Sequence, residues 1–187
     1  VQGCDNTGIL GRTIMNSKSK IRDKMLKQRE SLLPEEKIIA EKELIKEWKT
    51  FYHKKEYSFD HVALYWPTRN EISCLGIINH LFEEGHHCYL PVINDKEKKI
   101  FTFNEFTHNS ELEKNEFGIM EPINGEVASL NKLTLIIAPL LAFDDNGSRL
   151  GMGMGFYDFA LRNRPKISPL YIGLAYKFQK EVCWESE

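Results

Sequence analysis

The stretch PLLAFDDNGSRLGMGMGFYDFALR, residues 139–162, decides the fold of this chain. It begins at the end of an apolar run, passes through a turn rich in Asp and Gly, and continues into three glycines spaced two residues apart. Gly151, Gly153 and Gly155 have no side chains, so the backbone N–H groups of the loop can approach a phosphate directly. The residues after Gly155 are typical of a short helix. The stretch therefore predicts a strand, an anion-binding loop and a helix in succession.

The loop matches neither of the two commonest nucleotide-binding patterns, because it is not GxxxxGK[ST] and not GxGxxG. Asp158 follows within one helical turn and supplies a carboxylate that can hold a magnesium ion bridging nucleotide oxygens. A nucleoside triphosphate is the predicted ligand. On the spacing of the glycines alone, the alternative is a tight turn that binds nothing.

Apolar runs on either side of the loop predict a mostly parallel sheet. Residues 133–140, LTLIIAPL, are almost continuously apolar, as in a central strand that is covered on both faces. Residues 61–67 and 86–92 predict two more parallel strands joined by a helix. Residues 99–106 alternate and predict an added antiparallel edge strand, and residues 169–176 predict another buried strand. The expected fold class is α/β: a single three-layer α/β/α domain with a mostly parallel central sheet and a small antiparallel addition.

Two helices are expected before the first strand. Ser17 is placed to cap the first helix, and Pro34 to begin the second. The apolar residues that recur at helical spacing are Ile21, Met25, Leu26 and Leu32 in the first helix and Ile38, Ile39, Leu44, Ile45, Trp48, Phe51 and Tyr52 in the second. The basic residues expected on the surface of the first helix are Lys18, Lys20, Arg22, Lys24, Lys27 and Arg29. Residues 107–129 predict a surface loop that could cover a substrate.

The composition limits the classes of protein that the chain can represent. Its 187 residues, 42% hydrophobic and 28% charged, suit one domain, which we expect over residues 18–187 behind a flexible leader at 1–17. A net charge of −2 gives no basic field for nucleic acid. No apolar run approaches the roughly 20 residues that span a bilayer. The four cysteines are scattered, which predicts neither a zinc site nor a disulfide framework. We expect a cytoplasmic monomer without nucleic-acid or membrane partners.

Residues 139–161 resemble the signature of the 5-formyltetrahydrofolate cyclo-ligase family, PxxAFDxxGxRLGxGxGYYDxxL. The matching residues are Pro139, Ala142, Phe143, Asp144, Gly147, Arg149, Leu150, Gly151, Gly153, Gly155, Phe156, Tyr157, Asp158 and Leu161. The chain departs from the family at Met152 and Met154, where the family often has basic or aromatic residues, and at Phe156, which replaces the first tyrosine. The family also continues into a P…D tail with a further metal-side aspartate, whereas this sequence ends at CWESE.

The resemblance implies a set of site residues. An N-terminal KxxxR element of the family maps onto Lys18 and Arg22, which lie on one helix face. The implied ATP-binding residues are Lys18, Arg22, Arg149, Gly151, Gly153, Gly155, Phe156 and Tyr157, with Arg149 and Lys18 catalytic and Asp158 holding Mg²⁺. The implied folate-binding residues are Trp66, Glu71, Met152, Gly153, Met154, Gly155 and Phe156.

The resemblance implies ATP-dependent closure of 5-formyltetrahydrofolate, with or without a polyglutamate chain, to 5,10-methenyltetrahydrofolate, with release of ADP and phosphate. Two alternatives remain open: a non-catalytic folate or nucleotide binder, and an ATP-independent sugar-phosphate or CoA enzyme on a similar scaffold. For Glu71 the alternative is a carboxylate in the first turn of a helix, opposing the helix dipole. The six histidines and the run Lys96 to Lys99 are expected to be ordinary surface features.

Overall fold

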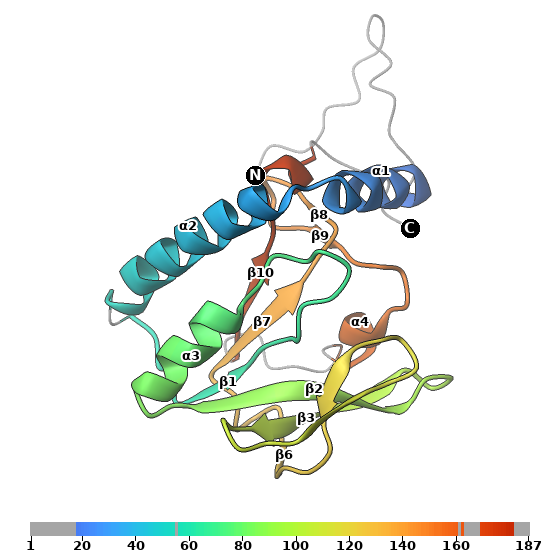
Figure 1. The fold of residues 1–187 in the computed structure, drawn as a ribbon. Coiled ribbons are helices and arrows are strands. Elements are labelled where there is room, and N and C mark those ends of the chain that lie inside the picture. The colour runs from blue at the N-terminus through green and yellow to red at the C-terminus, as the bar shows by residue number, and fades with distance from the viewer. Residues whose placement is uncertain (1–17, 55, 161, 163–168, 182–187) are drawn as a thin grey trace, which may run out of the picture.

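The computed structural model describes residues 18–54, 56–160, 162 and 169–181. Figure 1 shows a central sheet with helices around it. The helices are α1 (Lys18–Glu30), α2 (Pro34–Tyr52), α3 (Leu75–Glu83), α4 (Phe156–Ala160) and a 3₁₀ turn at Lys177–Gln179. The strands are β1 (His61–Ala63), β2 (His87–Asp95), β3 (Ile100–Phe106), β4 (Leu112–Lys114), β5 (Met120–Pro122), β6 (Val127–Ala128), β7 (Leu135–Pro139), β8 (Ala142–Phe143), β9 (Arg149–Leu150) and β10 (Leu170–Leu174).

The main sheet has the strand order β10-β7-β1-β2-β3-β6. The pairs β10–β7, β7–β1 and β1–β2 are parallel, while β2–β3 and β3–β6 are antiparallel. The β1–α3–β2 unit supplies the crossover that parallel neighbours require. The mostly parallel α/β sheet with an antiparallel addition is thus confirmed. Its strands β1, β7 and β10 end on the same side, where the glycine loop follows.

One face of the sheet is covered by α2 and α3. Trp48 of α2 is buried against this face together with residues of α3 and β1, and its indole Nε1 donates a hydrogen bond to Nδ1 of His80 over 3.3 Å. Ile38 and Ile39 follow the helical period of α2 but lie outside the core, since they are 52% and 57% exposed. The nine residues of α3 reach along only part of the 19-residue α2, so the first turns of α2 lack that cover.

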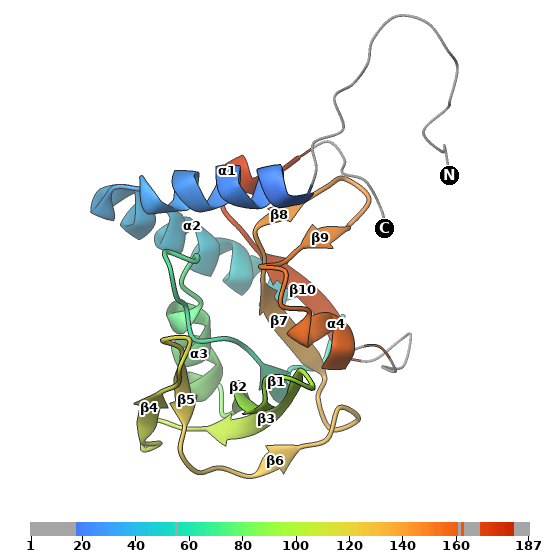
Figure 2. The ribbon, with the colours of Figure 1, turned by 90° about the vertical axis from the view of Figure 1, so that its right-hand side faces the viewer.

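The opposite face is covered only in part by the short helix α4. Tyr157 of α4 packs on a second core cluster that includes Ala63, Tyr89 and Ile136. Figure 2 shows α3 and α4 on opposite sides of the strands. The three expected layers are therefore present, and the second helical layer is a single short helix among the described residues.

Three predictions need correction: two about strands of the main sheet and one about the segment after β3. Residues 169–176 do not form a fully buried strand, because β10 is partly exposed and, among the described strands, pairs only with β7. The strand at 99–106 is antiparallel as expected, but it is not the edge, since β6 pairs with its other side. Residues 107–129 are not a plain surface loop, because they contain the hairpin β4–β5 as well as β6.

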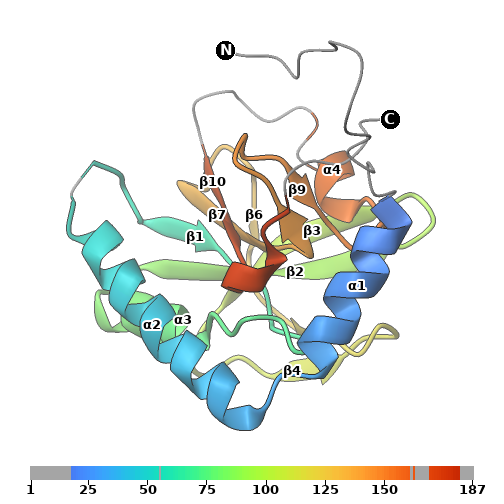
Figure 3. The same ribbon diagram turned by 90° about the horizontal axis from the view of Figure 1, so that it is seen from above.

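Helix α1 lies across the small β8–β9 hairpin rather than on the sheet (Figure 2). Ile21 and Met25 are buried there against Leu141, Ala142 and Leu150. Seen from above, α1 and α2 meet at a short connection and diverge along two sides of the molecule (Figure 3). This packing brings the N-terminal helix to the hairpin from which the glycine loop emerges.

Several expectations fall outside the described residues: the leader at 1–17, the cap at Ser17, the continuation of the helix after residue 162, and the chain end from residue 182. Among the residues that the structure describes, no helix has the length and apolarity needed to cross a bilayer.

Gly125 lies where the chain enters β6, and its backbone φ of +142° is a conformation that side chains rarely adopt. A β-carbon there would meet the backbone oxygen of Glu105 at 2.3 Å. We expect Gly125→Ala to lower the free energy of unfolding by roughly 3 kcal/mol or more, measured by urea denaturation. The matched control is Gly85→Ala, where φ is +81° and no atom is crowded; it should cost only about 1–2 kcal/mol. Equal losses would contradict the clash at Gly125.

Candidate functional site

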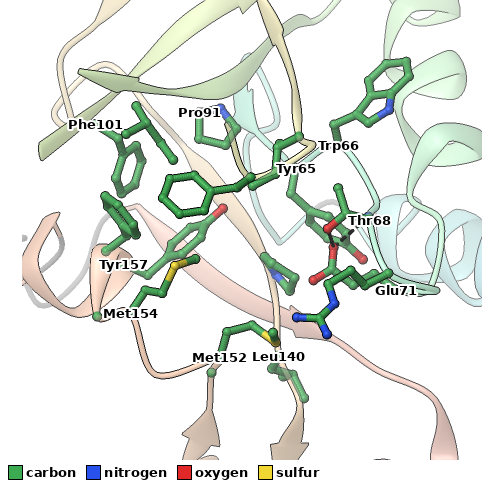
Figure 4. A pocket seen from close by; sticks show the side chains of 18 of the residues that line it. Tyr65, Trp66, Thr68, Glu71, Pro91, Phe101, Leu140, Met152, Met154 and Tyr157 are labelled. Atoms are coloured by element: carbon green, nitrogen blue, oxygen red, sulfur yellow. Dashed lines mark hydrogen bonds between the residues drawn. The ribbon is translucent and has the colours of Figure 1, made fainter. Parts of the chain in front are cut away.

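A cavity of about 450 Å³ opens beside the carboxyl ends of the parallel strands. Figure 4 shows its lining side chains. They come from the segment after β1, from β2 and β3, from the hairpin β4–β5, and from the stretch between β7 and α4. The lining residues are Tyr65, Trp66, Thr68, Arg69, Glu71, Pro91, Ile93, Phe101, Phe117, Ile119, Glu121, Pro139, Leu140, Arg149, Gly151, Met152, Gly153, Met154, Gly155, Phe156, Tyr157 and Asp158. The cavity therefore joins the glycine loop to the segment around Glu71.

The glycine loop needs its glycines for two physical reasons. Gly153 and Gly155 have backbone φ values of +95° and +74°, which disfavour any residue with a β-carbon. A β-carbon at Gly153 would also lie 3.3 Å from Cζ of Arg22. The loop is thus shaped by backbone conformation and by the close approach of a cationic side chain.

Arg22 reaches the loop from α1. Its Nε donates a hydrogen bond to the carbonyl oxygen of Gly151 over 3.0 Å. Arg22 does not line the cavity itself, and neither does Lys18, which lies one helical turn earlier on the same helix face. The structure therefore brings Arg22 to the loop as predicted, whereas a role for Lys18 stays a prediction.

Arg149 lies in β9 and faces the cavity. Its Nη2 donates to Oδ1 of Asp158 over 2.5 Å, and the two side chains are 18% and 76% exposed. Its guanidinium also lies over the rings of Tyr157 and Tyr171, with Cζ 5.7 Å and 5.4 Å from the ring centres. A planar guanidinium held in this way suits a phosphate, because it can donate two parallel hydrogen bonds.

Asp158 is the one predicted metal ligand, and it lines the cavity. Among the described residues, no cluster of three or more His, Cys, Asp or Glu side chains could hold a metal. Mg²⁺ is often held by one or two carboxylates together with substrate phosphates, so a single exposed carboxylate fits such a shared site. The cation would have to compete with Arg149 for the carboxylate.

The hydroxyl of Tyr157 is buried and has no hydrogen-bond partner within the described part of the chain. Figure 4 shows this ring directed into the cavity. Burial raises the pKa of Tyr157 well above its ordinary value, so the phenol stays protonated and can donate. A buried polar group without a partner is rare in proteins. The cavity wall therefore holds a phenol donor that no described residue satisfies.

Glu71 lies in a tight turn after β1 and not in a helix, because α3 begins only at Leu75. The alternative of a helix first-turn carboxylate is therefore wrong. Its Oε2 accepts hydrogen bonds from the backbone N and the hydroxyl of Thr68, over 3.0 Å and 3.3 Å. Burial raises the pKa of Glu71, while the Thr68 hydrogen bonds and the charge of Arg29 act in the opposite direction. Glu71 is thus a fixed hydrogen-bond acceptor in the cavity wall.

Arg29 is the residue that the sequence analysis missed. It was expected on the surface of α1, but only 1% of it is exposed. Its guanidinium donates hydrogen bonds to the carbonyl oxygen of Arg69, over 2.6 Å and 3.1 Å, and to that of Thr68, over 3.3 Å. It also lies 3.8 Å from the Glu71 carboxylate. The available signal was spacing, because Arg29 follows Met25 by four residues on the buried stripe.

The backbone turn that Arg29 holds is unusual. Arg69 and Asn70 both have positive φ, 45° and 57°. Nδ2 of Asn70 donates to the carbonyl oxygen of Arg29 over 3.0 Å, and Nζ of Lys37 donates to Oδ1 of Asn70 over 3.1 Å. Two consecutive left-handed residues are costly, so these contacts stabilise the turn that aims Glu71 at the cavity.

The hairpin β4–β5 forms the outer apolar wall of the cavity. Phe117 and Ile119 line it, and the ring of Phe117 contacts that of Phe156 at 6.3 Å between centres. Glu121 is buried and accepts hydrogen bonds from the backbone N of Ile93 and from Nδ2 of Asn115, which fixes the hairpin to β2. Coverage of a substrate by residues 107–129 stays a prediction that this geometry supports.

Comparison with known proteins identifies the family of this chain. The model of the 5-formyltetrahydrofolate cyclo-ligase family matches residues 14–182. The chain belongs to that family. A 5-formyltetrahydrofolate cyclo-ligase from Haemophilus influenzae is 39% identical over 122 residues, and one from Escherichia coli is 35% identical over 120 residues.

These matches cover 64% and 63% of this chain. They span 65% and 66% of the two curated cyclo-ligases, slightly less than two thirds of their lengths. The structure of 5,10-methenyltetrahydrofolate synthetase from Aquifex aeolicus superimposes with a TM-score of 0.76 at 29% identity. That superposition covers 91% of this chain and 83% of the other. The cyclo-ligase fold therefore extends over nearly the whole chain.

Replacement of Arg29 by Met should destabilise this cyclo-ligase fold strongly. The carbonyl oxygens of Thr68 and Arg69 would lose the guanidinium donor, and the Glu71 carboxylate would lose the cation 3.8 Å away. We expect a loss of roughly 3–5 kcal/mol in the free energy of unfolding, measured by urea denaturation. The matched control is Arg69→Met, since that side chain is 54% exposed and 3.9 Å from Glu30; it should cost below about 1 kcal/mol. Similar losses in both variants would argue against the clamp.

Proposed function

We propose that this chain is an enzyme that closes 5-formyltetrahydrofolate to 5,10-methenyltetrahydrofolate at the expense of ATP, releasing ADP and phosphate. Membership of the cyclo-ligase family supports the reaction class. The observation that carries the proposal is the single cavity in which the glycine loop and Arg149 face Trp66 and Glu71. One cavity thereby offers an anion site and an apolar site with a fixed acceptor, as two adjacent substrates require.

The chemistry explains the need for ATP. The formyl oxygen of an amide-like group is a poor leaving group, so attack on its carbon by the side-arm nitrogen of the folate would stall. In the proposed first step the formyl oxygen attacks the γ-phosphorus, and the bond to the ADP oxygen breaks. In the second step the side-arm nitrogen bonds to the formyl carbon and gives up its N–H proton. The carbon–oxygen bond then breaks, and the phosphate leaves with that proton. The protein then contributes positioning and charge neutralisation rather than covalent chemistry.

The nucleotide side of the proposed site is built on the loop. Arg149 would hold the transferred phosphoryl group, since its guanidinium faces the cavity and is kept in place by Asp158 and two rings. Arg22 would act from the α1 side, with Lys18 one turn away, while Gly151, Gly153 and Gly155 let the loop backbone close on the phosphates. Phe156 and Tyr157 begin the helix that follows.

Asp158 would hold Mg²⁺ together with the phosphate oxygens. The ion would neutralise negative charge on the phosphates. The exposed carboxylate of Asp158 lies at the cavity and is bound to only one guanidinium in the described residues. Because Asp158 lies next to Arg149, the cation and the guanidinium would act on the same group of phosphates.

The folate side would use the apolar walls and Glu71. Trp66, Met152, Met154 and Phe156 line the cavity and offer flat or flexible apolar surface to an aromatic ring. Glu71 would accept hydrogen bonds from N–H groups of the folate ring, since its carboxylate is already fixed by Thr68. The two methionines carry no charge, so any binding by these positions is apolar.

The first test of the proposal is the formation of methenyl-folate by the purified protein. Mixed with 5-formyltetrahydrofolate, Mg²⁺ and ATP, it should produce the absorbance band of the methenyl product, and it should produce none without ATP. Equal amounts of ADP and methenyl-folate should appear, because one phosphoryl transfer accompanies each closure. ATP binding without any product would favour a non-catalytic binder instead, and product formation without ATP would refute the proposed mechanism.

The roles of Arg149 and Asp158 can be separated by substitution. Arg149→Met should lower kcat by roughly 100-fold or more, because a donor to the transferred group is lost; Arg149→Lys, which keeps the charge but not the planar fork, should lie between. Asp158→Asn should raise the Mg²⁺ concentration for half-maximal rate. Thermal unfolding serves as the folding control. A normal Mg²⁺ titration in Asp158→Asn would leave Asp158 only as the partner of Arg149.

A further inference from the structure

Each glycine of the loop leaves room for one cationic side chain. A β-carbon at Gly151 would lie 3.4 Å from Nη1 of Arg149. A β-carbon at Gly153 would lie 3.3 Å from Cζ of Arg22, and one at Gly155 would lie 3.3 Å from Nζ of Lys99. The first two cations belong to the proposed site, and the third comes from a segment that the sequence analysis treated as a solvated turn.

Lys99 is brought to the loop by the turn between β2 and β3. Its φ of 57° is left-handed, and its backbone N donates to the carbonyl oxygen of Lys96 over 3.3 Å. The backbone N of Lys98 donates to Oδ1 of Asp95 over 2.9 Å, which closes the turn. Next along the chain, Phe101 contacts the ring of Tyr157 at 5.4 Å between centres. The turn is thus attached to the helix that follows the loop.

The other two lysines of this turn differ from Lys99 in their charge partners. Nζ of Lys98 lies 3.1 Å from Asp95, and Nζ of Lys96 lies 2.7 Å from Glu116. Lys99 forms no ion pair with another described residue, although its side chain is exposed and reaches the loop. Three cationic groups therefore surround the glycine loop, and the ion pair with Asp158 offsets only the charge of Arg149.

We infer that Lys99 is a third cationic residue of the phosphate site and binds the polyphosphate of the nucleotide; this inference rests on the proposed function. Lys99, like Arg22, approaches the glycine loop from outside the cavity lining, whereas Arg149 lies in that lining. A phosphate chain bound along the loop would therefore lie next to all three cations. Met154, the loop residue before Gly155, carries no charge, and the cation at this end of the loop comes from the distant turn instead. A mobile ammonium suits this place because it can follow a phosphate as a point charge.

Steady-state kinetics of Lys99→Met test the inference. Loss of one charge-assisted contact should raise KM for ATP by about 10-fold. KM for 5-formyltetrahydrofolate should stay unchanged, and KM for ATP should depend less on salt concentration. Met is unbranched like Lys, so the left-handed backbone at this position costs the same in both proteins. Lys99→Arg should restore most of the affinity for ATP.

Lys98→Met is the matched control, because this lysine belongs to the same turn but is 74% exposed and pairs with Asp95. It should leave both KM values unchanged. An unchanged KM for ATP in Lys99→Met would overturn the inference. A raised KM for 5-formyltetrahydrofolate with a normal KM for ATP would overturn it too, since Lys99 would then serve a carboxylate of the folate.

Failure of this inference can be distinguished from failure of the proposed function. A native protein that forms methenyl-folate with ATP, with Lys99→Met equally efficient, refutes only the role of Lys99. A native protein that binds ATP in calorimetry without turnover would refute the proposed enzyme, and about 10-fold weaker ATP binding by Lys99→Met would still support the phosphate contact. A native protein that neither turns over nor binds ATP would refute both.

Discussion

The buried guanidinium of Arg29 connects the two sides of the cavity. It lies on the same helix as Arg22, and both are held by the packing of Ile21 and Met25 on the β8–β9 hairpin. One helix therefore sets Arg22 against the glycine loop and Arg29 against the turn that carries Glu71. A buried charge is tolerated only when its hydrogen bonds are made. The position of α1 and the conformation of the turn that carries Glu71 therefore depend on each other. A shift of α1 would move both walls of the cavity together.

The glycine loop is a second constraint, and it is electrostatic as much as steric. Arg149, Arg22 and Lys99 approach the three glycines from β9, from α1 and from the β2–β3 turn. Like charges gathered around one loop repel one another, and the exposed carboxylate of Asp158 offsets only part of that repulsion. A polyanion would relieve it. The proposed phosphate site would thus sacrifice some stability in the free protein and gain affinity for phosphates.

The parallel sheet and the glycine loop were predictable because they depend on local patterns: continuous apolar runs, and glycines that leave the backbone without side chains. A place for Arg22 near the loop was implied only by the family resemblance. Local patterns do not show what tertiary contacts decide. Ile38 and Ile39 follow a helical period but lie beyond the cover of α3, and Arg29 is polar yet falls on the buried stripe of α1. In the sequence, Lys99 cannot be told apart from the other lysines of the charged run Lys96 to Lys99. Only the fold shows that its side chain, unlike theirs, reaches the loop.

The ion pair between Arg149 and Asp158 gives the order in which the proposed site would fill. Asp158 is 76% exposed, so solvent screens its ion pair with the less exposed Arg149 to roughly 1 kcal/mol, and the carboxylate can exchange partners. A phosphate that took the guanidinium of Arg149 would release the carboxylate, and the carboxylate would then be available to a cation bound on the same phosphate oxygens. Guanidinium and carboxylate would thus act on the nucleotide in sequence. In the free protein each of the two charges has a partner of opposite sign. The rings of Tyr157 and Tyr171 would hold the guanidinium of Arg149 in place while its partner changes from carboxylate to phosphate.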